Sequence, residues 1–572
     1  MGKKKNRQKK PAAAAAENTA LPGYARLPQK AICAFMILFT VFAVPFTETA
    51  TNESVYYTPG GVFTDNTVFS REAALFVFAA GLLLFFAGER LFPDRPIRPA
   101  LLSGKAHLPF FCAVGIYVFM AVISSVFSEY PFVCFWGAVT QHEGLAAVFG
   151  YAILAAAAYN YIYERDLPKL IRIITSGASL VITLMTLTEI FFGALPGLLF
   201  ASESSGAGSE LLFGNASVCG EVCALLIAPM LTFSLAEKHA VRRVGYSVLT
   251  GMLVLEVIRS ASSAALYVSG AAAAAVLAVF LFKRTRLIAA ASVIAAAAIP
   301  TCIFAVTQPA VFSSFIGSGA SNSGTYDPSG SFGLTDIEVN GDTIVLRNDN
   351  AEAVIVLTDD SIDMRSEGDT SAVRAELNDG LLTLDLGYSE PIYFQATDGV
   401  FRYIGINGYL EDELAKPAFP QLSQYYGFAT GRGYIWLTTA SMLGNCIIKG
   451  YGAGEFVFCY PHNDIVGALN THGTTAVITD KPHCMYLQIF AEYGLPALLA
   501  FLVIAVSVMK GGLRGVRSGS VEAAGLSVSA AAYLILGLVN DSCVISAVWF
   551  WLFSGIILGI AYKEKKVTHT NG

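Results

Sequence analysis

The feature that most constrains this chain is a series of long apolar runs. One membrane-spanning helix takes about 20 apolar residues, and twelve runs near this length lie at 31–47, 73–92, 108–127, 144–162, 173–193, 218–236, 245–258, 264–282, 287–306, 486–509, 521–539 and 543–562. Only 14% of the 572 residues are charged, against roughly 25% in globular proteins, which excludes a soluble enzyme. We therefore predict an all-α polytopic membrane protein of about twelve transmembrane helices.

The positions of lysine and arginine predict how these helices are oriented, because cytoplasmic loops are enriched in both residues. Alternate loops hold clusters of them, at 90–105, 165–169, 238–243, 283–286 and 510–517, and more follow the last run. Both termini are then cytoplasmic. Residues 1–30 are expected to form a basic disordered tail, and 563–572 a second tail. Helices one to nine occupy 31–306, and helices ten to twelve occupy 486–562.

The segment between the ninth and tenth runs has a different composition. Residues 307–333 form a Gly/Ser-rich linker. Residues 334–418 read as short strands with turn dipeptides such as Asn340-Gly341 and Asp379-Gly380, which predicts a small extracytoplasmic β-domain of antiparallel hairpins. Residues 419–485 mix polar and aromatic side chains, a pattern typical of interfacial helices, and they form the predicted catalytic loop.

No metal or cofactor site is predicted. The ten cysteines include no CxxC pair, and the outer loops hold no acidic cluster with metal-ligand spacing. The G-Y-G-x-G stretch at 450–454 lacks the strand–helix context of a nucleotide-binding loop, so we expect a tight turn packed against the bundle. A disulfide among Cys446, Cys459 and Cys484 is left open.

His483 and two arginines are the sharpest candidates for chemistry. His483 precedes a predicted span on the outer side, and histidine is the usual general base near neutral pH. Arg432 and Arg259 lie near predicted span ends, and a guanidinium binds phosphate in a bidentate manner. The structural alternatives are a solvated histidine and arginines that extend toward lipid headgroups.

Four further polar residues have two interpretations each. Glu492, inside a predicted span, is either functional or a hydrogen-bonding group of the bundle. Glu143 is either a site residue or a solvated loop carboxylate. Asn215 is either a site residue or a helix cap, and Lys481 either guides an anionic substrate or is a solvated charge.

Several short motifs follow one another on the predicted outer face. They are Glu143-Gly144-Leu145, Gly214-Asn215, an R-x-x-x-W pattern of Arg432 and Trp436, G-Y-G-x-G at 450–454, and DKPH-x-x-x-L-x-x-x-x-E-x-G-L with His483 and Glu492. In this order the chain resembles the O-antigen ligase / O-antigen polymerase superfamily of bacterial membrane glycosyltransferases, over roughly residues 120–310 and 425–510. One motif departs: the arginine of the family's S-R-G element aligns with Ser263, and Arg259 lies one helical turn earlier.

The resemblance implies a metal-independent, inverting glycosyltransferase, either a ligase or a polymerase, in polysaccharide biosynthesis of the cell envelope. Its donor is a glycan linked to a polyprenyl diphosphate, its acceptor is a hydroxyl of a glycan, lipid or protein, and it needs no cofactor. The enzyme is expected among the lipids of the cytoplasmic (inner) membrane. A net charge of −6 gives no indication of nucleic-acid binding.

In this reading His483 is the base, and Arg432 and Arg259 hold the diphosphate. Glu143, Asn215, Lys481, Glu492 and Trp436 bind substrate. Two alternatives come from other classes. A transporter or flippase of lipid-linked sugars would use Glu256 and Glu492 for proton coupling, although no inverted repeat is visible. A membrane-anchored sensor would use the β-domain as its receptor.

Overall fold

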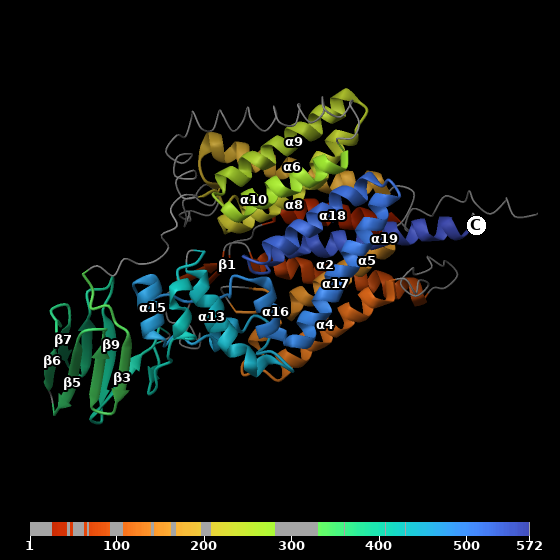
Figure 1. Cartoon of the computed structure of the whole chain (residues 1–572). Helices are drawn as coiled ribbons and strands as arrows, with labels where there is room; N and C mark the ends of the chain where they lie inside the picture. Colours follow the sequence, from red (N-terminus) through yellow and green to blue (C-terminus); the bar gives the residue numbers. More distant parts are fainter. Residues whose placement is uncertain are drawn as a thin grey trace, which may run out of the picture.

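A computed structural model describes residues 26–42, 46–49, 62–65, 68–91, 107–138, 142–161, 167–195, 208–280, 330–359, 361–406, 408–429 and 431–570. The protein is mostly helical (Figure 1). Within these ranges, seven helices are long and apolar enough to cross a membrane: α2 (Val68–Leu91), α4 (Leu108–Val126), α6 (Leu167–Phe192), α8 (Ala216–Ala236), α10 (Ser263–Phe280), α17 (Leu495–Arg517) and α19 (Val544–Thr570).

Other helices complete the bundle. Three are apolar but shorter, namely α1 (Leu27–Val41), α5 (Leu145–Tyr161) and α18 (Val521–Leu536), and α9 (Ala240–Arg259) is more polar. Ten of the predicted runs each overlap one helix, and the run 486–509 overlaps two. The run 287–306 and most of the predicted linker lie outside the described residues. The membrane character of the chain is therefore supported, whereas the count of twelve spans stays a prediction.

The predicted run 486–509 is two helices instead of one. The short helix α16 (Met485–Tyr493) ends at Gly494, and α17 begins at Leu495. Gly494 has φ +89°, a conformation that glycine adopts without steric cost, and a side chain there would meet Lys449 at 3.0 Å. Apolar periodicity cannot reveal such a break, because both helices are apolar. Glu492 consequently lies in α16, before the spanning helix.

The predicted β-domain is a sandwich of two antiparallel sheets. In the first sheet the strands lie in the order β3 (Asp336–Asn340), β4 (Thr343–Arg347), β5 (Glu352–Thr358) and β6 (Ser361–Glu367). In the second sheet they lie in the order β11 (Leu410–Glu411), β10 (Val400–Ile404), β9 (Ile392–Thr397), β8 (Leu381–Asp385) and β7 (Arg374–Asn378). Asp379 and Gly380 both have positive φ, as the two-residue hairpin turn requires. A separate ribbon pairs β1 (Phe46–Thr49) with β2 (Val62–Asp65).

The sandwich has its own hydrophobic core, and a helix from the following segment takes part in it. Leu346, Ile355 and Phe394 are fully buried between the sheets. Ile465 and Leu469 of α15 (Ile465–His472) belong to the same cluster. The β-domain is therefore packed onto a helix that lies within the predicted catalytic loop at 419–485.

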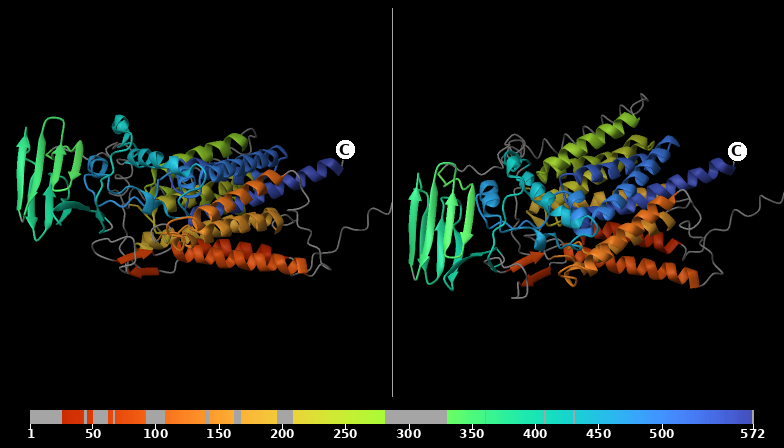
Figure 2. Two further views of the ribbon diagram at one scale, coloured as in Figure 1. Left: turned by 90° about the horizontal axis from the view of Figure 1, so that it is seen from below. Right: turned by 60° about the horizontal axis from the view of Figure 1, so that its bottom comes forward.

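The sandwich and the C-terminus lie at opposite ends of the molecule (Figures 1 and 2). Helices α13 (Arg432–Met442), α15 and α16 lie between the sandwich and the long helices. The loops predicted to share the outer face contact one another in pairs. Ser128 donates a 2.8 Å hydrogen bond to Glu455, and the Met485 amide donates one of 2.8 Å to the Asn540 carbonyl.

Candidate functional site

His483 lies in the loop before α16 and pairs with an acidic residue from the far end of the sequence. Its Nδ1 is 2.8 Å from Oδ2 of Asp541, which lies in the turn between α18 and α19. The Asp541 side chain is 9% exposed, while that of His483 is 38% exposed. The carboxylate is thus held inside the protein, and the imidazole reaches the surface.

The contacts around this pair fix its orientation. The other Asp541 oxygen accepts a 3.2 Å hydrogen bond from the Cys484 amide. The Met485 amide donates to the carbonyls of Gly537 and Asn540, at 2.9 and 2.8 Å. A carboxylate at Nδ1 selects the tautomer that carries its proton there, which leaves Nε2 able to accept a proton. The imidazole is therefore arranged as a general base with an aspartate behind it.

Arg432 and Trp436 lie one turn apart on α13, on the same face, and this face meets His483. The Trp436 indole donates to the His483 carbonyl at 3.4 Å. Arg432 is half-buried and, within the described ranges, its side chain forms no hydrogen bond or ion pair. Burial lowers the pKa of the Arg432 guanidinium, and the nearby Asp541 charge opposes that shift. An arginine of this kind stays charged and has donors to spare for an anion.

Lys481 brings a second cation, two residues before His483. It is half-buried. Burial lowers the pKa of its ammonium, but the charges of Asp480, Asp541 and Glu143 outweigh burial and raise that pKa overall. Lys481 makes no direct ion pair in the part of the chain that the structure describes. Arg432 and Lys481 thus place two cations near the His483–Asp541 pair, and the charge of Asp541 acts on both of them.

Glu143 is buried and has hydrogen-bond partners at both oxygens. It is 2% exposed. The hydroxyls of Tyr151 and Ser542 donate to one oxygen at 2.5 and 2.7 Å, and the Gln488 amide lies 3.5 Å from the other. Because Ser542 follows Asp541 directly, this network anchors the turn that holds Asp541. The interpretation as a solvated loop carboxylate is wrong, and a substrate contact stays a prediction.

Arg259 is placed differently from Arg432. It ends α9, is 8% exposed, and pairs with Glu189 at 3.1 Å and Glu256 at 2.8 Å. The structure gives it no contact with His483 or Arg432 among the described residues. Two carboxylates already compensate its charge, so a diphosphate would have to compete with them. Its predicted catalytic role is not supported by a contact and stays a prediction.

Asn215 and Glu492 have clear structural surroundings. Asn215 caps α8, where its side chain accepts from the amides of Ser217 and Val218 at 2.8 and 3.3 Å, so the interpretation as a helix cap is confirmed. Glu492 is fully buried near the end of α16, and its carbonyl accepts from the Gly452 amide at 3.0 Å.

The glycines at 450–454 pack against the bundle, as expected. A side chain on Gly450 would overlap the carbonyl group of Glu492, and one on Gly454 would come within 2.5 Å of Gly137. The Gly450 amide donates to the Ser124 hydroxyl of α4 at 2.9 Å. This close approach explains why residues without a Cβ are needed here.

The described cysteines and acidic residues form neither a disulfide nor a metal-ligand group at this site. Cys446, Cys459 and Cys484 are all free, so the structure contains no disulfide among them. No group of three or more potential metal ligands occurs among the described residues. The prediction of a metal-free mechanism is a matter for experiment.

Asp541 is the candidate site residue that sequence reasoning missed. In the sequence, the Asn540-Asp541-Ser542 turn is recognisable only as a short outer connection between two predicted spans. An acidic residue in a tight turn on the same face as His483 was the available signal. Its importance depends on a contact between positions 58 residues apart, which hydropathy cannot predict.

Comparisons with known proteins leave the function open. No protein-family model matches the chain, and no curated protein is found to be similar in sequence. The residue-level resemblance to the O-antigen ligases therefore stays a prediction.

Proposed function

We propose that this chain is a membrane glycosyltransferase that moves a glycan from a polyprenyl diphosphate to an acceptor hydroxyl. The observation that carries the proposal is the His483–Asp541 pair beside helix α13. That helix carries Arg432, which is half-buried and has no ion-pair partner among the described residues. A histidine held by an aspartate suits a reaction in which a proton leaves the acceptor hydroxyl. Cations that no described acid pairs with directly suit the negative charge that develops on a diphosphate.

Each group has a defined part in the reaction. The acceptor oxygen forms a bond to the anomeric carbon, and Nε2 of His483 takes the hydroxyl proton. The bond from the anomeric carbon to the phosphate oxygen breaks, and its electron pair leaves on the polyprenyl diphosphate. Arg432 and Lys481 stabilise that charge, and Asp541 stabilises the imidazolium. A single displacement of this kind inverts the anomeric carbon.

The proposal includes a topology. The loops around His483 and the β-sandwich face the extracytoplasmic side of the cytoplasmic membrane, both termini are cytoplasmic, and about twelve helices span the bilayer. The acceptor is a glycan, lipid or protein, and the enzyme is a ligase or a polymerase of cell-surface polysaccharide. No contact among the described residues favours the transporter or the sensor, and Glu256, one of the two proposed proton carriers, is paired with Arg259.

A transfer assay tests the proposal. Purified full-length protein is given a polyprenyl-diphosphate glycan, an acceptor and excess chelator. We expect wild type to transfer and both His483→Ala and Arg432→Ala to fail. His239→Ala and Arg402→Ala are matched controls, because His239 is exposed in the α8–α9 turn and Arg402 lies in the sandwich. Wild-type transfer by His483→Ala would refute the assignment of the base.

A further inference from the structure

A groove between α4 and α17 combines an apolar wall with a cationic end. Its cavity of about 580 Å³ is lined by both helices. Leu499, Val503 and Val506 form the apolar part and are 54%, 44% and 51% exposed. Lys510 and Arg514 follow at spacings that keep them on the same face of α17, and both line the groove.

The dimensions of the groove match half of a bilayer. From Leu499 to Lys510 the helical rise gives about 16 Å. The hydrocarbon core of a membrane is about 30 Å thick, so one leaflet contributes about half of it. The apolar wall thus has the length of an acyl chain, and the two cations lie where a headgroup phosphate would be.

Charge complementarity identifies the occupant. In the ranges that the structure describes, neither Lys510 nor Arg514 forms an ion pair. The opposite wall holds His107, which is 4% exposed, and the N-terminal end of α4, where the helix dipole favours negative charge. We propose that this groove binds an anionic phospholipid, with its phosphate on Lys510 and Arg514 and one acyl chain along Leu499–Val506.

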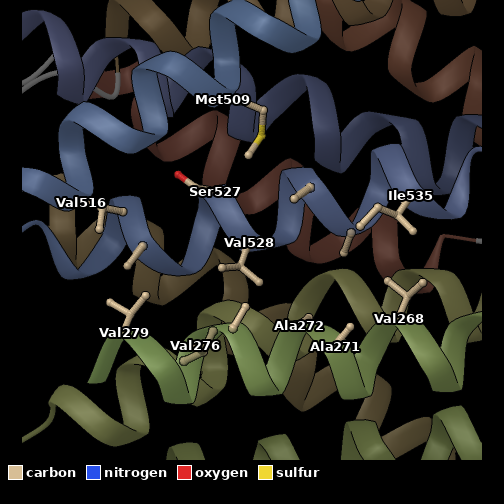
Figure 3. A pocket seen from close by; sticks show the side chains of 14 residues that line it. Val268, Ala271, Ala272, Val276, Val279, Met509, Val516, Ser527, Val528 and Ile535 are labelled. Carbon is tan, nitrogen blue, oxygen red and sulfur yellow. The ribbon is translucent and has the colours of Figure 1, made fainter. Parts of the chain in front are cut away.

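A second groove shows why the cations matter. Valine and alanine side chains line a smaller cavity of about 190 Å³ between α10, α17 and α18 (Figure 3). Among its described lining residues the one polar side chain is Ser527, which donates to the Ala523 carbonyl of its own helix. Since none of those lining residues is charged, this groove serves as an internal control for the first one.

The site has a structural consequence for the loops around His483. Helix α4 ends beside the loop at 450–454, through the Gly450–Ser124 hydrogen bond. Helix α17 continues α16 beyond Gly494. A lipid that bridges α4 and α17 at their far end therefore stabilises the pair of helices on which those loops rest. The inference needs only a membrane-embedded chain and does not depend on the proposed chemistry.

Native mass spectrometry of the full-length protein with added phosphatidylglycerol tests the site. We expect Lys510→Ala/Arg514→Ala to bind this lipid about thirtyfold more weakly, because each cation near a membrane surface contributes about fivefold. The control Lys238→Ala/Arg242→Ala removes the same charge from exposed positions in the α8–α9 turn and the first turn of α9 and should bind as wild type does. Equal binding by both double variants would overturn the proposal.

Steric variants separate the groove from its charge. Ser507→Phe fills the α4–α17 groove and keeps both cations, so it should also lose the lipid, whereas Ala271→Phe in the second groove should keep it. Two other results would reject a lipid occupant. One is inorganic phosphate stabilising the delipidated protein as well as phosphatidylglycerol does. The other is a loss of stability in Lys510→Ala/Arg514→Ala that is as large in purely neutral lipid as in lipid that contains phosphatidylglycerol. That result would place a segment of this chain in the groove.

Discussion

Tyr434 of α13 donates a 2.9 Å hydrogen bond to the carboxylate of Asp464, the residue that caps α15. Tyr434 and Asp464 are 3% and 1% exposed. Helix α13 begins with Arg432, and α15 belongs to the core of the β-sandwich. A buried hydrogen bond thus joins α13, which holds the proposed phosphate ligand Arg432, to α15, which packs into the core of the β-sandwich.

This junction should respond to pH through Asp464. Burial raises the pKa of this carboxyl from 3.8 to about 6. The folded-state pKa lies above the unfolded one, so its contribution to stability is complete below about pH 4 and is lost as pH rises through 6. We expect hydrogen exchange of the α15 amides to be faster at pH 7.5 than at pH 5, after correction for the intrinsic exchange rate. Asp464→Asn should abolish most of that difference; an unchanged difference would mean that another group titrates.

Tyr434→Phe removes the hydroxyl and keeps the ring. Loss of one buried hydrogen bond to a charged group costs about 1.5–3 kcal/mol, so the junction should open more often. We expect increased protease cleavage between the sandwich and α13 and reduced transfer activity. Tyr425→Phe is the control, since Tyr425 is 54% exposed. If Tyr434→Phe leaves both cleavage and activity at wild-type levels, the hydrogen bond does not couple the two parts.

Asp541→Asn should lower kcat strongly and leave KM nearly unchanged. The amide cannot stabilise an imidazolium and can select the wrong tautomer, and a general base contributes about 10²–10⁴-fold. Transfer kinetics of Asp541→Asn and His483→Ala should show losses of similar size, and the double variant should lose little more than either single one. Additive losses would show that the two residues act independently.

Glu143 is expected to position the Asp541 turn. Glu143→Ala leaves Tyr151, Ser542 and Gln488 without their acceptor, which costs about 1–3 kcal/mol for each buried group left unpaired. We expect a lower thermal stability and a lower kcat, and Glu143→Gln should restore part of both. An effect on the donor KM alone would instead support the substrate contact that the sequence predicts.

Arg432→Lys tests whether shape or charge is required. Lysine keeps the charge but loses the planar fork that binds phosphate in a bidentate manner. Removal of one donor to a developing negative charge costs about 10²–10³-fold, so we expect Arg432→Lys to retain a fraction of the activity and Arg432→Gln to retain almost none. Equal activity of the two variants, measured at saturating donor, would argue against a phosphate contact.

Gly450→Ala should destabilise the protein. Its Cβ would overlap the Glu492 carbonyl group, and backbone atoms cannot move aside cheaply. Overpacking of this kind costs about 1–3 kcal/mol or more. Gly444→Ala is the matched control, because no atom lies within 4 Å of the place that its methyl group would take. Thermal unfolding should separate the two; similar midpoints would contradict the close packing.

Local patterns of the sequence predicted the elements of the fold well. Hydropathy located the helices because a bilayer requires long apolar runs, and the Asp379-Gly380 dipeptide located a hairpin because few residues adopt positive φ. The Gly450 turn and the Asn215 cap were likewise readable, since each depends on its immediate neighbours.

The contacts within the candidate site were less predictable. The pairing of His483 with Asp541, and of Arg259 with Glu189, joins residues 58 and 70 positions apart. The break at Gly494 was also missed, because one glycine within an apolar stretch leaves the hydropathy unchanged. What the sequence could indicate was the type of residue on the outer face; which of them meet depends on how the helices pack.

The break at Gly494 also determines how the site responds to its surroundings. A spanning helix tilts when bilayer thickness changes, and α17 is long and apolar enough to be such a helix. His483 instead precedes α16, which is held by the α18–α19 turn and by the glycine loop at 450–454. We expect the break at Gly494 to let α17 change its tilt with less displacement of His483 than one continuous helix would cause, so that the proposed reaction geometry depends less on the tilt of α17.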